Sequence, residues 1–510
     1  MRTEPFLCAL LCLFLGEFTS GAKILAVLPV ASPSHGIWNK ALIEALADKG
    51  HDLTVLSANS GKNRPNLRYV EIENSFEGAD DIPFADIAAL NSFGNIVFVF
   101  EWLYMTCQMQ IKANGTREAI LDSKERYDLI IYESTGVDCF LGTMHKFAGT
   151  PSVAISAYGF SCFNCDPTGV WCPPSTVPVE WFPVPDEMSF WQRLHNWVLV
   201  QTTKLTFHWY HTPRHQTLAE KAFGPLPPIR SLDKFDLFLS NTGPVGVDLA
   251  RHLPPNVKEV GCVQCRKGKP LEKDLQEYLD SAKNGFIFMS FGSNVKSSLL
   301  PKEKIDIFLK VFGELDIKVL WKFETDLPQK PKNVMIKKWL PQQDILAHEN
   351  IKLFITHGGR LSVQESMYHG VPMLAVPFFA DQYINGQKAV NKGVGLKLHL
   401  PNLTAENWKN SIETILNNPG FSERAKRLSL IASDELESPL ERAVFWTEYV
   451  IRHKGAKHLQ PAGSHLNWVQ LHSLDVISFL MTILIVTATV ALLAIKLILE
   501  LRKKQKLKKK

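Results

Sequence analysis

The body of this 510-residue chain has almost no excess of charge of either sign. The formal net charge is +5, but the last ten residues, LRKKQKLKKK, alone contain seven Lys or Arg residues. A nucleic-acid-binding protein needs a basic patch on its folded part, so this class of function is excluded. The sequence also lacks a Gly-x-Ser-x-Gly motif and an internal repeat, which argues against a serine hydrolase and against a solenoid.

The chain is longer than one hydrophobic core usually fills, so we expect two domains of roughly 200 residues. Apolar residues make up 45% of the chain and charged residues 21%, as in an ordinary folded protein. Strand-like apolar runs alternate with amphipathic helix patterns in both halves, which predicts an α/β fold. A Pro-rich stretch around residues 244–255 predicts the linker between the halves.

Both ends of the chain carry membrane signals. Residues 1–22 contain Arg2, an apolar run and small residues before the expected cleavage site, which indicates a secretory signal peptide. Residues 476–495 are uncharged over about the 20 residues that span a bilayer, so we expect a transmembrane helix over residues 474–499. The basic tail, residues 500–510, should stay in the cytoplasm, with the body of the protein in the lumen.

Two further features indicate the endoplasmic reticulum. Lys506 and Lys508 have the spacing of a lysine-based retrieval signal. Asn114 and Asn402 each begin an N-glycosylation sequon, which fits exposure to the lumen. We therefore expect a single-pass protein of type I in the membrane of this organelle.

Nine cysteines become seven when the signal peptide is removed. The pairs Cys162-x-x-Cys165 and Cys262-x-x-Cys265 have the spacing of a four-thiolate zinc site. An oxidising lumen instead favours disulfides among Cys162, Cys165 and Cys172, whose pairing the sequence leaves open.

Two strand-to-helix passages follow each other in the second half of the chain. The first apolar run, residues 350–356, ends at a His-Gly-Gly turn that starts at His357, and the glycines allow a close approach to a ligand. A helix is expected to begin near Ser362, with Glu365 three positions later as in a capping box. The second run ends at an Asp-Gln pair that starts at Asp381. The pattern predicts a ligand with a phosphate at one end and hydroxyl groups at the other.

This stretch resembles the signature of the UDP-glycosyltransferases. In that family the Trp stacks on the uracil, the Gln after Pro holds the ribose region and the His-Gly-Gly turn takes the diphosphate. The Glu on the next helix binds ribose hydroxyls, and the Asp-Gln pair binds the sugar. The resemblance implies a donor site that contains the matching residues, which are Trp339, Gln342, His357, Gly359, Glu365, Asp381 and Gln382.

An earlier turn and one departure from the family pattern also concern the donor site. Gly292 and Ser293 match a family turn that contacts the diphosphate through backbone N–H groups. Four residues after the His, the vertebrate pattern has Asn where this chain has Leu361. Ser362 is therefore expected to supply this polar contact, or the contact is lost.

A βαβ pattern at the start of the mature chain places His35 in a loop at the carboxyl end of a strand. A loop His is often only a surface residue, but the resemblance places the family's catalytic base in this loop. An imidazole is basic enough to take a proton and is largely neutral near pH 7.

A carboxylate could orient His35 and stabilise its protonated form. Two residues are candidates. Glu133 stands at the end of the strand-like run 127–132, and Asp138 matches the residue type of the family and precedes a Cys. We favour Asp138 and keep Glu133 as the alternative.

The resemblance extends over nearly the whole chain and is greatest to the membrane-bound animal enzymes, the insect ones in particular. It implies two Rossmann-like domains facing across a cleft (GT-B type), plus one C-terminal transmembrane helix. Residues 23–243 would bind the acceptor and residues 244–455 the UDP-sugar, with a helix over residues 438–452 that packs back on the first domain. Residues 158–230 are rich in aromatics and prolines and are expected to carry acceptor specificity.

The resemblance implies the inverting transfer of a hexose, glucose by the insect likeness, from a UDP-sugar co-substrate to a hydroxyl of a small lipophilic acceptor. Glucuronosyl transfer and a catalytically silent nucleotide- or hydrophobic-ligand-binding protein are the alternatives; Leu361 supports the latter. Arg251 matches a position that holds glucuronic acid in some vertebrate relatives, but it does not decide the sugar. We expect no metal ion, because no Asp-x-Asp pair is placed to hold one on a diphosphate. A homo-oligomer remains open.

Overall fold

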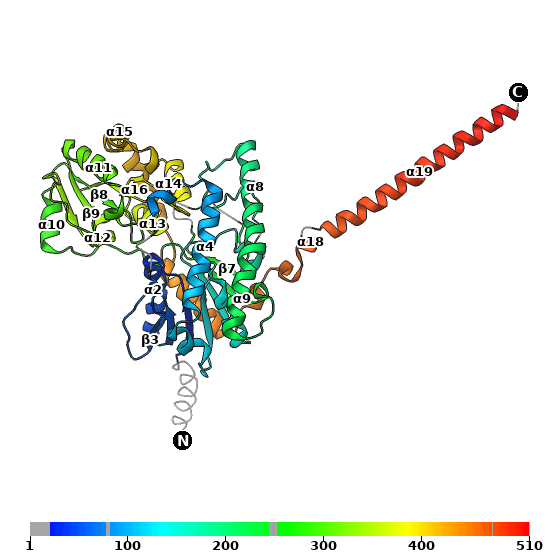
Figure 1. Ribbon diagram of the computed structural model, residues 1–510, viewed down its shortest axis with the longest axis horizontal. Helices are drawn as coiled ribbons and strands as arrows, with labels where there is room; N and C mark the ends of the chain where they lie inside the picture. The colour runs from blue at the N-terminus through cyan, green and yellow to red at the C-terminus, as the bar shows by residue number, and fades with distance from the viewer. Residues whose placement is uncertain are drawn as a thin grey trace, which may run out of the picture. The chain divides into compact units, whose positions relative to one another are not determined.

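The structure of the chain is a computed structural model, which describes residues 21–77, 82–170, 172–243, 248, 252–471 and 473–508. The predicted signal peptide as far as residue 20, Arg251 and most of the predicted linker lie outside the described residues. The chain divides into two compact units, Met1–Gln460 and Pro461–Lys510. The first unit contains two parallel sheets, and the second contains the long helix α19, Leu474–Lys508 (Figure 1).

Seven parallel strands form the first sheet in the order β3-β2-β1-β4-β5-β6-β7. Their bounds are Lys23–Leu28 (β1), Asp52–Ser57 (β2), Leu67–Glu71 (β3), Leu129–Glu133 (β4), Ser152–Ser156 (β5), Leu237–Ser240 (β6) and Val257–Glu259 (β7). β1 is buried along nearly its whole length because apolar clusters cover both faces of the sheet. The strand order reverses between β1 and β4, and such a switch point opens a crevice at the carboxyl ends of the strands. β7 extends this sheet past the predicted domain boundary at residue 243.

Six parallel strands form the second sheet in the order β10-β9-β8-β11-β12-β13. Their bounds are Phe286–Ser290 (β8), Lys318–Lys322 (β9), Val334–Lys337 (β10), Ile351–Thr356 (β11), Met373–Ala375 (β12) and Gly395–Lys397 (β13). The order reverses between β8 and β11, so this sheet also has a switch point. The predicted α/β fold with parallel strands in both halves is confirmed.

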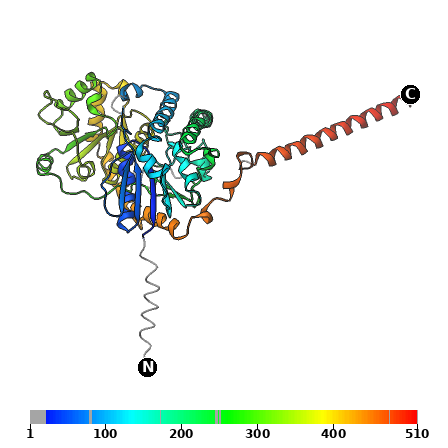
Figure 2. The same cartoon turned by 60° about the horizontal axis from the view of Figure 1, so that its bottom comes forward.

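The helices of the first half are α2 (Pro33–Asp48), α3 (Phe84–Ile87), α4 (Ser92–Gln110), α5 (Asn114–Thr116), α6 (Gly142–Lys146), α7 (Cys165–Thr168), α8 (Phe190–Thr206) and α9 (Thr212–Phe223). Short turns of 3₁₀ or π-helix are η2 (Arg117–Leu121), η3 (Asp138–Leu141), η4 (Phe207–His211) and η5 (Ile229–Ser231). α2 begins at Pro33, because a proline loses no hydrogen bond in the first turn of a helix. α4 and α8 contact each other and lie side by side in both ribbon views (Figures 1 and 2).

The helices of the second half are α10 (Lys273–Asp280), α11 (Lys302–Glu314), α12 (Gln342–Leu346), α13 (Arg360–Tyr368), α14 (Gln382–Asn391), α15 (Ala405–Asn417), α16 (Pro419–Ser433) and α17 (Pro439–Arg452), with 3₁₀ turns η6 (Ser297–Leu299), η7 (Leu400–Asn402) and η8 (Lys457–Leu459). α17 starts with a capping box, in which Ser438 and Glu441 bond each other's backbone N–H. Its residues Ala443 and Val444 belong to the apolar cluster of the first sheet, beside Trp38 of α2. The end of the second half therefore packs back on the first half.

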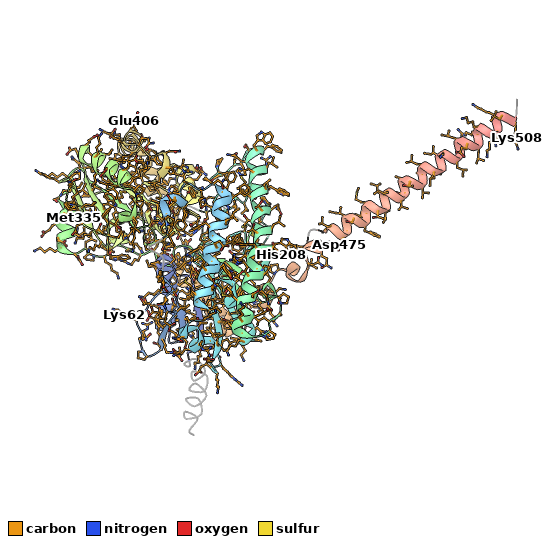
Figure 3. The ribbon with its side chains drawn as sticks, in the orientation of Figure 1. Lys62, His208, Met335, Glu406, Asp475 and Lys508 are labelled. Carbon is orange, nitrogen blue, oxygen red and sulfur yellow. A yellow bond between two sulfur atoms is a disulfide. The ribbon has the colours of Figure 1, made fainter. Side chains whose placement is uncertain are left out.

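The second unit contains η9 (Ala462–His465), α18 (Trp468–Leu471) and α19. α19 has 35 residues, none of which is buried. Its side chains project on every side of the helix between Asp475 and Lys508 (Figure 3). By length and composition this helix can cross a membrane. It continues past residue 499, so the predicted basic tail is helical as far as Lys508.

Three disulfides connect cysteines in the described part of the chain, namely Cys107–Cys139, Cys165–Cys172 and Cys262–Cys265. The second lies within the group of three cysteines that was expected to form a disulfide. The third joins two cysteines of the hypothetical zinc site to each other, so a zinc site of four thiolates is wrong. The first joins α4 to η3 across 32 residues and was not predicted.

Candidate functional site

One cleft of about 410 Å³ is lined by residues that follow the strands at both switch points. Every predicted site residue except Glu133 lines it; these are His35, Asp138, Gly292, Ser293, Trp339, Gln342, His357, Gly359, Ser362, Glu365, Asp381 and Gln382. The first half adds an apolar wall that includes Phe98, Trp102, Phe163, Trp181 and Phe207. The cleft therefore joins a polar side on the second half to an apolar side on the first.

His35 and Glu133 form a close pair at the switch point of the first sheet. The ring Nδ1 of His35 lies 2.6 Å from Oε1 of Glu133, which is the last residue of β4 and is fully buried. His35 lies in the first turn of α2 rather than in the predicted loop, because the helix already begins at Pro33. A carboxylate on Nδ1 requires a proton there, so Nε2 keeps its lone pair and can accept a proton.

Asp138 belongs to a different cluster of charges. Its Oδ2 accepts hydrogen bonds from Nε2 of His211, at 3.2 Å, and from Arg230, at 3.1 Å. Burial acts to raise the pKa of Asp138, but the bond from His211 and the charge of Arg230 hold this pKa well below its usual range. The preference for Asp138 as the partner of His35 is therefore wrong in this geometry. The reason is tertiary: the last residue of β4 reaches His35, whereas Asp138 pairs with Arg230 from η5.

Trp339, Gln342 and Glu365 form the outer part of the donor side. Trp339 is 66% exposed and offers a flat apolar face to the cleft. Nε2 of Gln342 donates to Oε2 of Glu365, at 2.7 Å, and to Oγ of Ser362, at 3.1 Å. Burial raises the pKa of Glu365 to about 7, although the hydrogen bonds from Gln342 and Gln264 oppose this shift.

α13 begins earlier than the sequence predicted. Gly359 is its N-cap residue and makes no side-chain hydrogen bond, so Ser362 is not the N-cap and the proposed capping box with Glu365 is wrong. The positive φ of Gly358, +80°, completes the turn after β11 and lets the helix start at once. The first N–H groups of α13 consequently have no side-chain cap, which suits an anionic ligand.

His357 fills the space between two glycine turns. A Cβ atom at Gly292 would lie 2.5 Å from Cε1 of His357, and one at Gly359 would lie 2.3 Å from its Nε2. These close approaches require glycine at both positions. Burial lowers the pKa of His357 to about 3, with a smaller contribution from the charge of Lys322. Burial therefore favours the neutral form of His357, which can form a hydrogen bond to a phosphate.

Lys322, the last residue of β9, supplies a positive charge beside this turn and was not among the predicted site residues. Its Nζ donates to the backbone O of Gly292, at 3.0 Å, and to Glu324, at 2.9 Å. The side chain is 11% exposed and lines the cleft. Its place at the carboxyl end of a strand beside β8 was the one signal in the sequence that could have singled it out.

Asp381 and Gln382 stand at the inner end of the donor side. Oδ2 of Asp381 accepts a hydrogen bond from Asn385, at 2.8 Å. Burial raises the pKa of Asp381, and the charge of Arg360 opposes this shift. Arg360 also lines the cleft.

Asp248 forms ion pairs with two cations near this end. It contacts Arg360 at 2.9 Å and Lys388 at 2.9 Å. Burial acts to raise the pKa of Asp248, but these two cations hold it well below its usual range. The two cations thus share one buried carboxylate.

Two parallel α/β halves that share a cleft, with a nucleotide-sugar signature on the second half, define a glycosyltransferase of the GT-B fold. A family model described as "UDP-glucoronosyl and UDP-glucosyl transferase" matches residues 22–510. The chain belongs to the UDP-glycosyltransferase family and is an enzyme of that type.

Individual relatives and solved structures agree with this assignment. UDP-glucosyltransferase 2 of the insect Dactylopius coccus is 35% identical over 91% of this chain and 90% of its own length. UDP-glucuronosyltransferase 2B18 of Macaca fascicularis is 31% identical over 91% of each chain. The solved structure of the glycotransferase of kitacinnamycin is 16% identical and covers 85% of this chain and 99% of its own, with a TM-score of 0.56, which supports the fold.

Proposed function

We infer that this chain, as a member of the family, transfers glycosyl groups from UDP-sugars to small acceptors. We propose that the sugar is glucose, that the acceptor is a lipophilic molecule with a hydroxyl group, and that the transfer inverts the anomeric centre. The observation that carries this proposal is the His35–Glu133 pair, whose histidine lines the same cleft as the donor residues of the second half.

His35 acts as the general base. Nε2 takes the proton of the acceptor hydroxyl while the oxygen attacks the anomeric carbon from the face opposite the UDP. Glu133 keeps the ring in the required tautomer and stabilises the imidazolium that forms. General-base assistance of this kind contributes a factor of about 10²–10⁴ in rate.

Groups around His357 stabilise the departing diphosphate. The N-terminus of α13 and the backbone N–H groups after Gly292 offer hydrogen-bond donors, and Lys322 adds one positive charge. Trp339 stacks on the uracil, and Gln342 and Glu365 hold the ribose. Asp381 and Gln382 bind the sugar hydroxyls.

The charges at the sugar end favour a neutral hexose. Arg360 and Lys388 share Asp248, and the charge of Asp381 also acts on Arg360. A sugar carboxylate would have to compete with these two aspartates for the two cations. The insect relative named above is a UDP-glucosyltransferase, which points in the same direction. Glucuronosyl transfer is the second candidate, since relatives at about the same identity use that sugar by name.

We propose that the body of the enzyme lies in the lumen of the endoplasmic reticulum and that α19 anchors it as a type I protein. The basic residues at the end of α19 support this orientation, because such residues remain on the cytoplasmic side.

The proposal can be tested with microsomes that contain this chain. They are supplied with several UDP-sugars and a mixed library of phenols and terpenoids, and the products are identified by mass. We expect hexosides from UDP-glucose. His35→Ala should retain UDP binding and lose nearly all turnover, whereas the control His145→Ala, at an exposed position, should not. UDP-glucose binding without product across the library would favour the silent binding protein, and turnover of His35→Ala within about threefold would refute the base assignment.

A further inference from the structure

The apolar wall of the cleft contains a cluster of charges that the transfer mechanism does not use. Asp138, Arg230 and Asp233 all line the cleft. Arg230 contacts Oδ2 of Asp138 at 3.1 Å and Oδ2 of Asp233 at 2.5 Å. Its guanidinium also lies 4.7 Å from the centre of the Phe207 ring, which belongs to the same wall.

The cluster sets two carboxylates against one guanidinium and the imidazole of His211. One guanidinium faces two carboxylates that are 5% and 4% exposed. His211 adds a hydrogen bond to Asp138, and the neighbouring His215 is neutral, because burial lowers its pKa well below the usual value. The contacts of Arg230 and His211 with these aspartates are made to Oδ2. The cluster can thus accept further hydrogen bonds on one side of an otherwise apolar pocket.

A second observation in the same wall also indicates a ligand. The indole Nε1 of Trp181 has no hydrogen-bond partner among the described residues, although this side chain is 2% exposed. A buried indole N–H without an acceptor is costly unless a ligand supplies one. Trp181 packs on Phe163, which packs on Phe207 beneath Arg230, so these groups share one continuous wall.

We propose that Asp138, Arg230 and Asp233 form a second polar subsite, which binds a hydroxyl group of the acceptor other than the one that is glycosylated. A hydroxyl can donate a hydrogen bond to a carboxylate and can accept one from an N–H donor. An alkyl group does neither, and a carboxylate only accepts. The preferred acceptors are therefore lipophilic molecules with two hydroxyl groups, one at His35 and one at this subsite. This inference rests on the proposed function and adds a class of acceptor to it.

Phenols with a para side chain that ends in methyl, hydroxyl, ammonium or carboxylate provide the test, in a series of two to six carbons. The measured quantity is kcat/KM with UDP-glucose for the intact chain in microsomes. At the best chain length, we expect the hydroxyl compound to exceed the methyl compound by about tenfold, as for a hydrogen bond to a charged group. The carboxylate compound should be the poorest, because it would meet two aspartates.

Asp233→Asn should reduce the preference for the hydroxyl compound to about twofold, mainly through KM, and Asp233→Glu should restore part of it. The control Asp122→Asn removes an exposed carboxylate outside the cleft, which pairs with Arg117, and should keep the preference of the wild type. The proposed subsite is wrong if kcat/KM for the hydroxyl and methyl compounds differs by less than twofold at every chain length. It is also wrong if the ammonium or the carboxylate compound is preferred. Absence of turnover with every phenol would instead refute the proposed function, since the methyl compounds need only His35.

Discussion

Replacing Glu133 by Gln tests how His35 is activated. In the transition state the imidazole gains a positive charge, and the Glu133 carboxylate lies 2.6 Å from its Nδ1 in a fully buried position. At about 4 Å between charge centres and an effective dielectric constant of about 20, the attraction is worth about 4 kcal/mol. Gln has the same shape without the charge, so kcat should fall by about 10³-fold.

The assay is the initial rate with saturating UDP-glucose and a phenol, followed by product mass. Asp138→Asn provides the comparison, because Asp138 was the favoured partner on sequence alone. This variant breaks a buried ion pair with Arg230 and should lose about 3 kcal/mol of stability, measured by chemical denaturation, while kcat falls less than tenfold. If Glu133→Gln stays within tenfold of the wild type and Asp138→Asn loses more than a hundredfold in kcat, Asp138 is the partner and our reasoning fails.

Three further predictions concern the donor side and the fold. Lys322→Met should weaken UDP binding more than tenfold and leave uridine binding within twofold, as measured by calorimetry. An equal loss of affinity for UDP and uridine would show that Lys322 does not contact the diphosphate. Because ribose hydroxyls need an ionised acceptor at Glu365, whose pKa is about 7, KM for UDP-glucose should fall as the pH rises through 7, and Glu365→Gln should abolish this slope. Because the pKa of Glu365 is higher in the folded chain than in the unfolded chain, the protonated form of Glu365 stabilises the fold. This contribution to the free energy of unfolding is complete below about pH 4.5 and is lost as the pH rises through 7. Replacing Cys165 and Cys172 by Ser should cost about 2 kcal/mol of unfolding free energy, as expected for a short closed loop; an unchanged midpoint would exclude this disulfide.

The sheets were predictable because each strand is a short apolar run. Such runs are expected in a parallel sheet, whose two faces are both buried. The run that became β11 and the turn at His357 were both identified in this way. The start of α13 was not, since two glycines turn the chain earlier than the Ser362–Glu365 pattern suggests. His35 was expected in a loop because the proline two residues before it was not taken as the first residue of a helix.

Contacts between distant segments could not be read from the sequence. The choice between Glu133 and Asp138 depended on which side chain meets His35, and spacing along the chain carries no such information. The disulfide between Cys107 and Cys139 likewise joins residues that no local pattern connects. Ion pairs such as that of Arg230 with Asp138 appear only once η5 is packed against η3.

The stereochemistry of the product tests the central claim most directly. UDP-glucose carries its glucose in the α configuration, and attack from the opposite face by an acceptor activated at His35 must give a β-glucoside. The anomeric proton of the product, observed by NMR as it forms, distinguishes the two configurations. We expect the β-glucoside alone and its disappearance in His35→Ala; an α-glucoside, or a β-glucoside formed equally fast by that variant, would contradict the account.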